Sequence, residues 1–283
     1  MRAPTLQISI VTPSYNQAAY LEEALLSVKS QNHPRFEHLV IDGISSDGSV
    51  EMLKRNSERP DWGHLRWISE HDAGQSDALN KGFRLASGSI IGWLNSDDRY
   101  RPECFCCVSR AFAAYPEADI IYGDYTWIDE SGRLLQIRKE IEFSQFILNF
   151  HCMLYIPTTA TFFRRRIFDD GNFLDPKFNC AMDYEFFMRL ARRGYRFQHV
   201  PELLADFRWH PASKSQSLTA RQIQEHDSIA LQYSGLLLRI PEGNLRRIAF
   251  RTLRTAAAWL RYAKKLFRGY YFLGPRYSPT SRD

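Results

Sequence analysis

The segment Ser-Ile-Ile-Gly-Trp-Leu-Asn-Ser-Asp-Asp, residues 89–98, decides the fold class that we expect for this chain. Its apolar part, Ser89–Leu94, is typical of a buried β-strand. A helical pattern over Ser76–Ala86 precedes it and ends at a glycine, and two adjacent carboxylates, Asp97 and Asp98, follow it. Helix, strand and polar loop in this order form the repeating unit of an α/β sheet.

The same unit recurs on the N-terminal side of this segment. Apolar, β-branched runs predict three earlier strands, at Ile8–Thr12, Phe36–Ile41 and Leu65–Ile68. Helical spacing of apolar residues predicts helices between and after them, at Ala18–Ser30, Val50–Asn56 and, after the fourth strand, Cys104–Tyr115. This alternation favours an α/β fold with a mostly parallel sheet and helices on both faces.

The second half of the chain is less regular. The turn 129–132 predicts a hairpin between Ile120–Ile128 and Leu134–Ile141. Further strands are expected at Thr159–Phe163 and Leu203–Arg208, and helices at Phe143–Phe150, Met182–Arg193 and Ala220–Leu236. A boundary at Arg239–Asn244 divides the expected main domain, residues 1–240, from a C-terminal tail, residues 241–283.

Composition sets broad limits on the kind of protein. The chain has 283 residues, of which 44% are hydrophobic and 24% charged, as in ordinary globular domains. It contains no apolar run of roughly 18 residues or more, and its N-terminus lacks a signal-peptide pattern. Its five cysteines have no metal-binding spacing and predict reduced, mostly buried thiols. These features together predict a cytoplasmic protein.

The net charge of +5 is distributed unevenly. Residues 243–283 hold ten Lys and Arg residues and one acid, a net +9, which leaves −4 for the rest of the chain. Six cations follow helical spacing along one face (Arg247, Arg251, Arg254, Arg261, Lys265 and Arg268), and apolar residues follow another (Ala249, Leu253, Ala256, Leu260, Ala263 and Phe267). With Trp259 and Tyr270–Phe272 nearby, the tail predicts a basic amphipathic helix on a membrane surface. The alternative is a surface helix packed on the domain, and no nucleic-acid partner is expected.

Polar residues follow each of the four predicted strands of the first half, at residues 13–16, 42–43, 70–72 and 95–98. Because ligands bind at the carboxyl ends of strands in such sheets, these residues are expected to form one site. Adjacent carboxylates such as Asp97 and Asp98 repel each other, and a divalent cation relieves that repulsion. Mg²⁺ or Mn²⁺ held by these acids together with substrate phosphates is therefore predicted, against the alternative of a solvated turn that caps a helix.

The same strand ends offer groups for a nucleotide. Asp42 can accept an imide N–H from a uracil or thymine ring, and Tyr15 can stack on a base. Asp72 can accept hydroxyls of a sugar or ribose, and Lys81 can offset phosphate charge. The alternatives are a helix-capping turn around Asp42, a tyrosine that closes the sheet edge, and a solvent-facing helix that carries Lys81.

Four of these stretches, in this order, resemble motifs of the family 2 glycosyltransferases with a GT-A fold. They are Thr12–Asn16, Asp42–Gly48, Asp77–Gly82 and Gly92–Asp98, and the resemblance covers about residues 6–210. It implies a nucleotide-binding half at 1–100, an acceptor-binding half at 101–240, and an inverting displacement on a UDP- or dTDP-sugar. It also implies that Pro13, Tyr15 and Asp42 hold the base, that Asp97 contacts the ribose or the metal, and that Asp98 binds the metal. Ile44 departs from the family, which often has a small or polar residue there.

The resemblance also implies a catalytic base at the start of a helix in the second half. Asp183 matches that place, and a carboxylate there would take the proton of the acceptor hydroxyl. The alternative is that Asp183 is an ordinary N-cap. The basic, hydroxyl-rich loop from Arg208 to Ser215 carries His210 and Lys214, which are candidates to close over the pyrophosphate or its metal.

The sequence therefore predicts a metal-dependent inverting glycosyltransferase that uses a nucleotide diphosphate sugar and a hydroxyl acceptor. The acceptor is expected to be a lipid-linked saccharide of cell-envelope or exopolysaccharide synthesis, with the enzyme peripheral on the inner face of the cytoplasmic membrane. One alternative is a catalytically inactive protein that binds sugar nucleotides. Another is a nucleotidyltransferase, which would show a glycine-rich basic loop after the first strand, and Thr12–Ala18 has none.

Overall fold

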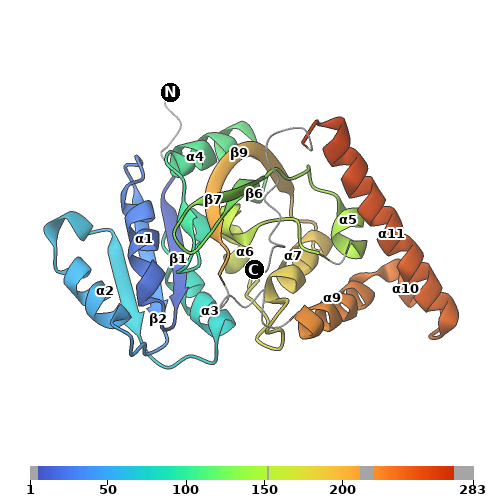
Figure 1. The fold of residues 1–283 in the computed structure, drawn as a ribbon, viewed down its shortest axis with the longest axis horizontal. Helices are drawn as coiled ribbons and strands as arrows, with labels where there is room; N and C mark the ends of the chain where they lie inside the picture. Colours follow the sequence, from blue (N-terminus) through green and yellow to red (C-terminus); the bar gives the residue numbers. More distant parts are fainter. Residues whose placement is uncertain (1–5, 152, 211–218, 271–283) are drawn as a thin grey trace, which may run out of the picture.

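The computed structural model describes residues 6–151, 153–210 and 219–270, and Figure 1 shows an α/β arrangement in which a curled sheet has helices packed around it. The order of strands along the sheet is β3-β2-β1-β4-β8-β6-β9-β5, with β7 paired to β6. The strands of the first half are β1 (Ile8–Ser14), β2 (Phe36–Asp42), β3 (Leu65–Ser69) and β4 (Ile90–Trp93). Those of the second half are β5 (Arg99–Tyr100), β6 (Ile120–Ile128), β7 (Leu134–Arg138), β8 (Thr161–Arg164) and β9 (Phe197–Arg208).

The helices alternate with these strands and continue after the last of them. Those before β6 are α1 (Ala18–Lys29), α2 (Ser49–Ser57), α3 (Gln75–Leu85) and α4 (Cys104–Ala114). Later ones are α5 (Gln145–Phe150), α6 (Arg166–Asp169), α7 (Met182–Arg192), α9 (Thr219–Tyr233), α10 (Gly235–Leu238) and α11 (Asn244–Phe267). Two short 3₁₀ helices occur at Pro60–Trp62 and Thr158–Ala160.

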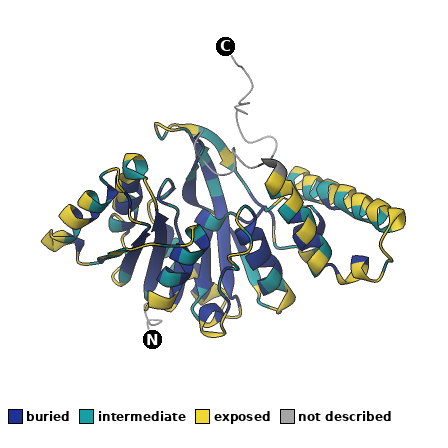
Figure 2. Cartoon of the chain, turned by 90° about the horizontal axis from the view of Figure 1, so that it is seen from below, coloured by how far each residue is buried: buried dark blue, intermediate teal, exposed yellow. Residues whose placement is uncertain are grey.

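Apolar spacing explains how the helices attach to the sheet. Helix α1 buries Leu21, Ala24, Leu25 and Val28, which share one face at helical spacing. Helix α3 packs closely on β1 at Gly82. A Cβ at this position would come within 2.2 Å of Val11 Cγ1, so only glycine allows this approach. Figure 2 shows that the sheet is buried and that the outer faces of the helices are exposed. This close packing fixes the start of α3 beside the tips of the strands.

The predicted α/β class is confirmed, and so is the parallel pairing of the first four strands. The predicted hairpin between β6 and β7 is also present. Antiparallel pairs join the two halves, because β8 lies between β4 and β6 and runs against both. The short elements β5 and α6 were not predicted, since two and four residues give no measurable periodicity.

Strand β9 begins at Phe197, well before the predicted start at Leu203. The register with β6 shifts between the pairs Tyr122–His199 and Asp124–Leu203, and Pro201 lies in that interval. Proline cannot donate a hydrogen bond to a sheet, so it interrupts the strand pattern in the sequence while the strand continues as an irregular pair.

The four described cysteines form no disulfide with one another, but only Cys104 is buried, so the expectation of mostly buried thiols is not met for these four. The division of the chain at residue 240 stays a prediction. Helix α11 packs beside α5 and α10 (Figure 1) through a small apolar cluster that includes Phe150, Leu237 and Ala257. Within the described part of the chain, the helices lack the combination of length and apolar character needed to span a bilayer.

Candidate functional site

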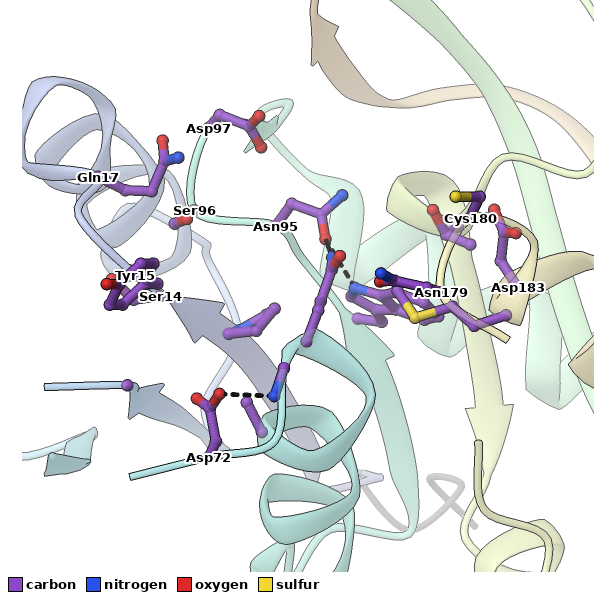
Figure 3. Close-up of a pocket in the computed structure, with 18 of the residues that line it drawn as sticks. Ser14, Tyr15, Gln17, Asp72, Asn95, Ser96, Asp97, Asn179, Cys180 and Asp183 are labelled. Atoms are coloured by element: carbon purple, nitrogen blue, oxygen red, sulfur yellow. Dashed lines mark hydrogen bonds between the residues drawn. The ribbon is translucent and has the colours of Figure 1, made fainter. Parts of the chain in front are cut away.

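A cavity of about 730 Å³ lies at the carboxyl ends of the first four strands. Its strand-tip wall includes Ser14, Gly43, Asp72, Asn95, Ser96 and Asp97, so the predicted convergence of these four loops is confirmed. Its other wall includes Asn179, Cys180, Met182 and Asp183, at the start of α7. Figure 3 shows the two walls facing each other, with Asn95, Ser96 and Asp97 between Tyr15 and Asp72 on one side and Asp183 on the other.

One end of the cavity is formed by Tyr15, Gly43, Ile44 and Asp72. The tyrosine is 63% exposed, so its ring does not close the sheet edge as the alternative interpretation required. A Cβ at Gly43 would lie 2.7 Å from Asp72 Oδ2 and 3.3 Å from Tyr15 Cδ2. Glycine is therefore the residue that lets the aromatic ring and the carboxylate approach the backbone of the β2 tip together.

The loop after β2 is held in a strained conformation. Ile44 has a φ of 62°, which a β-branched residue rarely adopts, and it is 46% exposed at the rim of the cavity. The loop is tied to the β1 tip by Asn16, whose backbone N–H donates to Ser45 Oγ and whose side chain accepts from the Ser46 N–H. Asp47 accepts the Ala18 N–H at the start of α1, which matches its expected structural role.

Asp42 lies beneath this loop and is fully buried. Its carboxylate accepts the backbone N–H and the hydroxyl of Ser45, at 2.9 and 2.5 Å, and the hydroxyl of Ser69 at 2.7 Å. A carboxylate has about four acceptor sites, so three donors leave roughly one free. Recognition of a base by Asp42 stays a prediction. Pro13 lines the cavity, and its predicted contact with the base stays a prediction.

Lys81 is held away from the cavity by partners of its own. Its ammonium donates to the His71 carbonyl at 2.8 Å and pairs with Glu70 at 2.9 Å and with Asp77 at 3.5 Å. It is absent from the residues that line the cavity, so the prediction that it offsets phosphate charge does not fit this geometry. Lys81 instead fixes the loop that presents Asp72.

Asp97 and Asp98 point in different directions. Asp97 lines the cavity, and one of its oxygens lies 3.0 Å from His210 Nε2. Asp98 is buried, and its oxygens accept the Arg208 backbone N–H at 2.8 Å, the Thr159 hydroxyl at 2.5 Å and the Asn95 amide at 3.2 Å. Burial, and then the neighbouring charge of Asp97, raise the pKa of Asp98 well above its ordinary value. Asp98 is absent from the residues that line the cavity, and its predicted role as the metal ligand stays a prediction.

Arg208, at the end of β9, holds the Asp97 loop in place. Its fully buried guanidinium donates to the Asp97 carbonyl, to the carbonyls of Asp129 and Glu130, and to the Glu23 carboxylate. The same group lies over the Tyr20 ring, 4.9 Å from its centroid. One side chain thus connects β9, the loop after β4, the hairpin turn and α1.

Asn95 and Gln75 form the floor between the two ends of the cavity. Asn95 Oδ1 accepts from Trp93 Nε1 at 2.8 Å and from Gln75 Nε2 at 3.0 Å, and Figure 3 marks bonds of Asn95. Gln75, the first residue of α3, also lines the cavity. These bonds fix the loop that carries Asp97 to the start of α3.

Asp183 is in the first turn of α7, is partly buried and faces the cavity. Burial raises the pKa of Asp183, and the nearby His226 opposes that shift. Glu185, two residues on, is buried and pairs with Arg189, so it faces another side of the helix as expected. Asp183 is thus the acid at the start of α7 that the cavity reaches.

Glu225 of α9 is the functional candidate that the sequence did not reveal. One of its carboxylate oxygens accepts the backbone N–H groups of Cys180 and Ala181, at 2.9 and 3.0 Å. Both N–H groups lie just before α7, so the carboxylate acts as a remote cap for the helix that carries Asp183. No spacing in the sequence could show this, because the partners are more than 40 residues apart.

His210 is buried beside Asp97, and its ring lies 5.0 Å from that of Tyr20. Its predicted closure over the pyrophosphate or its metal stays a prediction. Lys214 lies outside the described residues.

This site can hold a divalent cation only when a bound ligand supplies further coordinating oxygens. Among the described residues, no cluster of three or more His, Cys, Asp or Glu side chains is arranged to hold a metal. Asp97 with the adjacent His210 offers a two-residue site in the cavity. Mg²⁺-type sites use one or two carboxylates plus substrate phosphates, so the residues present fit a cation that arrives with a diphosphate.

Comparison with known proteins decides the family. The family model described as Glycosyl transferase family 2 matches residues 9–188, which contain the four strand tips and Asp183. The chain belongs to glycosyl transferase family 2. The resemblance seen in the sequence is therefore confirmed, and with it the prediction of a glycosyltransferase.

Relatives of this family 2 chain include bacterial glycosyltransferases. An uncharacterized glycosyltransferase of Mycobacterium tuberculosis is 32% identical over 193 residues, which cover 67% of this chain and 70% of the relative. The O-antigen biosynthesis protein RfbC of Myxococcus xanthus is 31% identical over 70% of this chain and 15% of RfbC. The uncharacterized protein y4gI of Sinorhizobium fredii is 28% identical over 76% of this chain and 24% of y4gI. The chain thus spans less than a quarter of the length of the last two relatives.

Solved structures share the fold of this family 2 chain. S. aureus TarS in complex with UDP superposes with a TM-score of 0.63 at 15% identity, over 95% of this chain and 76% of TarS. The mannosyltransferase PcManGT from Pyrobaculum calidifontis, in complex with GDP-Man and Mn²⁺, superposes with a TM-score of 0.61 at 17% identity, over 89% of this chain and 73% of PcManGT. At such identities the likeness concerns the fold, which confirms the expected GT-A type.

Proposed function

We propose that the chain transfers a sugar from a nucleotide diphosphate donor to a hydroxyl acceptor with inversion at the anomeric carbon. The observation that carries this proposal is the opposition of two acids in one cavity. Asp97 lies on the strand-tip wall, and Asp183, with a raised pKa, lies on the wall formed by α7. A diphosphate held beside Asp97 would present its sugar toward Asp183, which an inverting displacement requires.

The donor is proposed to bind with its base at the end formed by Tyr15, Gly43 and Asp72. The exposed ring of Tyr15 supplies a stacking surface, and the Asp72 carboxylate beside Gly43 supplies an acceptor for ribose hydroxyls. Asp42, beneath the loop, has acceptor capacity for one further donor such as an imide N–H. UDP and dTDP both carry that imide, and the complex of TarS with UDP supports this choice.

Asp97 and His210 are proposed to hold Mn²⁺ or Mg²⁺ together with phosphate oxygens of the donor. The complex of PcManGT with GDP-Man and Mn²⁺ supports a metal in this fold. When bound, a divalent cation stabilises the negative charge that develops on the leaving diphosphate.

Asp183 is proposed to take the proton of the acceptor hydroxyl as that oxygen attacks the anomeric carbon. The bond from the anomeric carbon to the diphosphate oxygen breaks, and the nucleoside diphosphate leaves with the bonding electrons. A raised pKa makes the carboxylate a stronger base than an ordinary aspartate, since base strength follows pKa.

The acceptor is proposed to be a lipid-linked saccharide of cell-envelope or exopolysaccharide synthesis, used at the inner face of the cytoplasmic membrane. The name of RfbC supports a polysaccharide pathway. The exposed apolar side chains of helix α11 support a membrane partner.

A panel of nucleotide sugars tests the proposed activity. We expect release of nucleoside diphosphate from one UDP- or dTDP-sugar, and loss of that release when EDTA is added. Binding of a sugar nucleotide without turnover under every acceptor tried would favour the inactive binding protein instead. Release that EDTA leaves unchanged would refute the proposed metal.

Glu225 is predicted to position the base rather than to touch substrate. Glu225→Ala removes the acceptor for the Cys180 and Ala181 N–H groups, so we expect the turnover number to fall about tenfold at unchanged donor KM. Glu225→Gln keeps an acceptor oxygen and is expected to restore most of the loss. Steady-state kinetics measure both.

The matched control for Glu225 is Asp227→Asn on the same helix, since Asp227 pairs with Arg254 and not with the α7 loop. It is expected to keep the normal turnover number. A positioning role would be contradicted if the Gln and Ala variants lost the turnover number equally and the acid limb of the pH profile of activity, which reports the pKa of the base, did not shift.

A further inference from the structure

Helix α11 presents two faces of different character, and they do not coincide with the two faces predicted from the sequence. The helix runs from Asn244 to Phe267 and contains no acid. Its cations were expected to face outward to an acidic surface. In the structure, most of that cationic face is turned toward the domain.

Acids of the domain neutralise the inward cations. Arg261 and Lys265 pair with the buried Glu140 at 2.9 and 3.0 Å. Arg254 pairs with Asp227 at 3.1 Å, and Arg268 pairs with Glu142. Burial lowers the pKa of Lys265 to about 8. Four of the six predicted cations thus attach the helix to its own domain and are poorly placed to attract a second acidic surface.

The outward face is apolar and aromatic. Ile248 is 62% exposed, Trp259 is 67% exposed and Phe267 is 89% exposed. The other exposed large apolar side chains of the helix are Leu245, Leu260, Tyr262 and Leu266. Leu245, Ile248, Trp259, Tyr262 and Leu266 follow steps of three, four and eleven residues, so they lie along one side of the helix. We call this set, together with Phe267, the outer apolar face.

Exposing such a row of apolar side chains to water does not stabilise the fold. Large apolar patches on protein surfaces mark interaction sites. Tryptophan and tyrosine favour the boundary between a bilayer and water, because one end of each ring system is polar. Arg247 and Arg251 are exposed on the same helix and can reach anionic headgroups beside the stripe.

We propose that the outer apolar face of α11 inserts into the surface of a bilayer, and that the inward cations serve to hold the helix on the domain. This builds on the membrane partner proposed above and names the side chains that make the contact. A second copy of the chain is the poorer occupant, since two acid-free helices brought face to face would set like charges together. The apolar contact, more than the cations, then provides the binding free energy.

Sedimentation with vesicles of phosphatidylcholine and phosphatidylglycerol tests this assignment on the full chain. The double variant Trp259→Ser and Phe267→Ser removes two aromatic side chains from the outer face, and we expect vesicle binding to fall by about tenfold or more. Both side chains are largely exposed, so the thermal unfolding temperature is expected to stay unchanged.

The matched control is Arg254→Gln, which removes one inward cation already paired with Asp227. We expect its vesicle binding to stay within about twofold, whereas a cation facing an anionic bilayer would contribute about fivefold. Unchanged binding in the double variant, or a larger loss in Arg254→Gln, overturns the proposal. Self-association in solution that the double variant abolishes would assign the face to a second copy and likewise overturn it.

The vesicle-binding measurement does not depend on the activity of the proposed active site. Donor hydrolysis measured without vesicles depends on the cavity and not on the outer apolar face, so both variants are expected to keep it. Loss of vesicle binding with intact hydrolysis supports the proposal, while absent hydrolysis in the unaltered chain would concern the proposed function alone.

Discussion

Asp183→Asn is expected to lower the turnover number by about a thousandfold while the affinity for the donor stays within about threefold. General base catalysis contributes roughly 10²–10⁴-fold, and an amide cannot take the acceptor proton. The donor is expected to keep its affinity because its proposed contacts lie on the opposite wall of the cavity. Steady-state kinetics and calorimetric titration with the nucleoside diphosphate measure the two quantities.

A matched control for this variant is Asp169→Asn, because that side chain is 59% exposed and pairs only with Arg165 in the ion pairs described. It is expected to keep a normal turnover number. If Asp183→Asn keeps a rate close to that of the unaltered chain, Asp183 is not the base.

The pH profile gives an independent view of Asp183. The base works only when deprotonated, so activity is lost as the pH falls through its pKa. Because burial raises that pKa, we expect the acid limb of kcat/KM to lie above the usual range of an aspartate. An acid limb at the ordinary aspartate value would assign the base to a more exposed group.

The second large effect separates the two adjacent acids. Asp97→Asn is expected to abolish the strengthening of nucleotide binding by Mn²⁺ and to leave the unfolding temperature nearly unchanged. Asp98→Asn is expected to keep the Mn²⁺ effect but to lower the free energy of unfolding by about 1–3 kcal/mol, because an amide cannot serve all the donors that Asp98 now accepts. Calorimetric titration of the nucleotide, with and without Mn²⁺, and thermal unfolding measure these effects.

The opposite result for the two variants would support the sequence prediction that Asp98 binds the metal. If Asp98→Asn removed the Mn²⁺ effect at an unchanged unfolding temperature, Asp98 and not Asp97 would hold the metal. Loss of the effect in both variants, with normal stability in both, would mean that the two acids share the cation.

The sequence predicted the layout of the first four strands well, for a local physical reason. Strands β1 to β4 have clear apolar runs, and parallel strands bring their polar ends to one edge. The convergence of Tyr15, Asp72 and Asp97 follows from that rule alone. What the rule cannot give is the direction of each side chain.

The pair Asp97 and Asp98 shows this limit. Which acid faces the cavity depends on Arg208, whose backbone N–H binds Asp98 across 110 residues of sequence. Lys81 is a similar case, since Glu70 and the His71 carbonyl, which lie on another loop, hold its ammonium away from the cavity. Long-range polar contacts, rather than local patterns, decide these cases.

Helix α11 was predicted correctly as a helix, but four of the six cations that share its predicted basic face attach it to the domain. The spacing of its cations indicates a face, but not whether that face meets solvent or the domain. Glu140 and Asp227 decide the orientation, and both lie on other elements of the fold. A pattern of charges on one helix therefore needs the charges of its neighbours before it can be interpreted.

The connections made by Arg208 have a thermodynamic consequence for the donor. Because one buried guanidinium joins the Asp97 loop to the hairpin turn and to α1, folding already orders this part of the strand-tip wall before any nucleotide arrives. The loss of conformational entropy needed to order that wall belongs to folding, so little of it remains to oppose association. A preorganised wall of this kind favours a high affinity from few contacts.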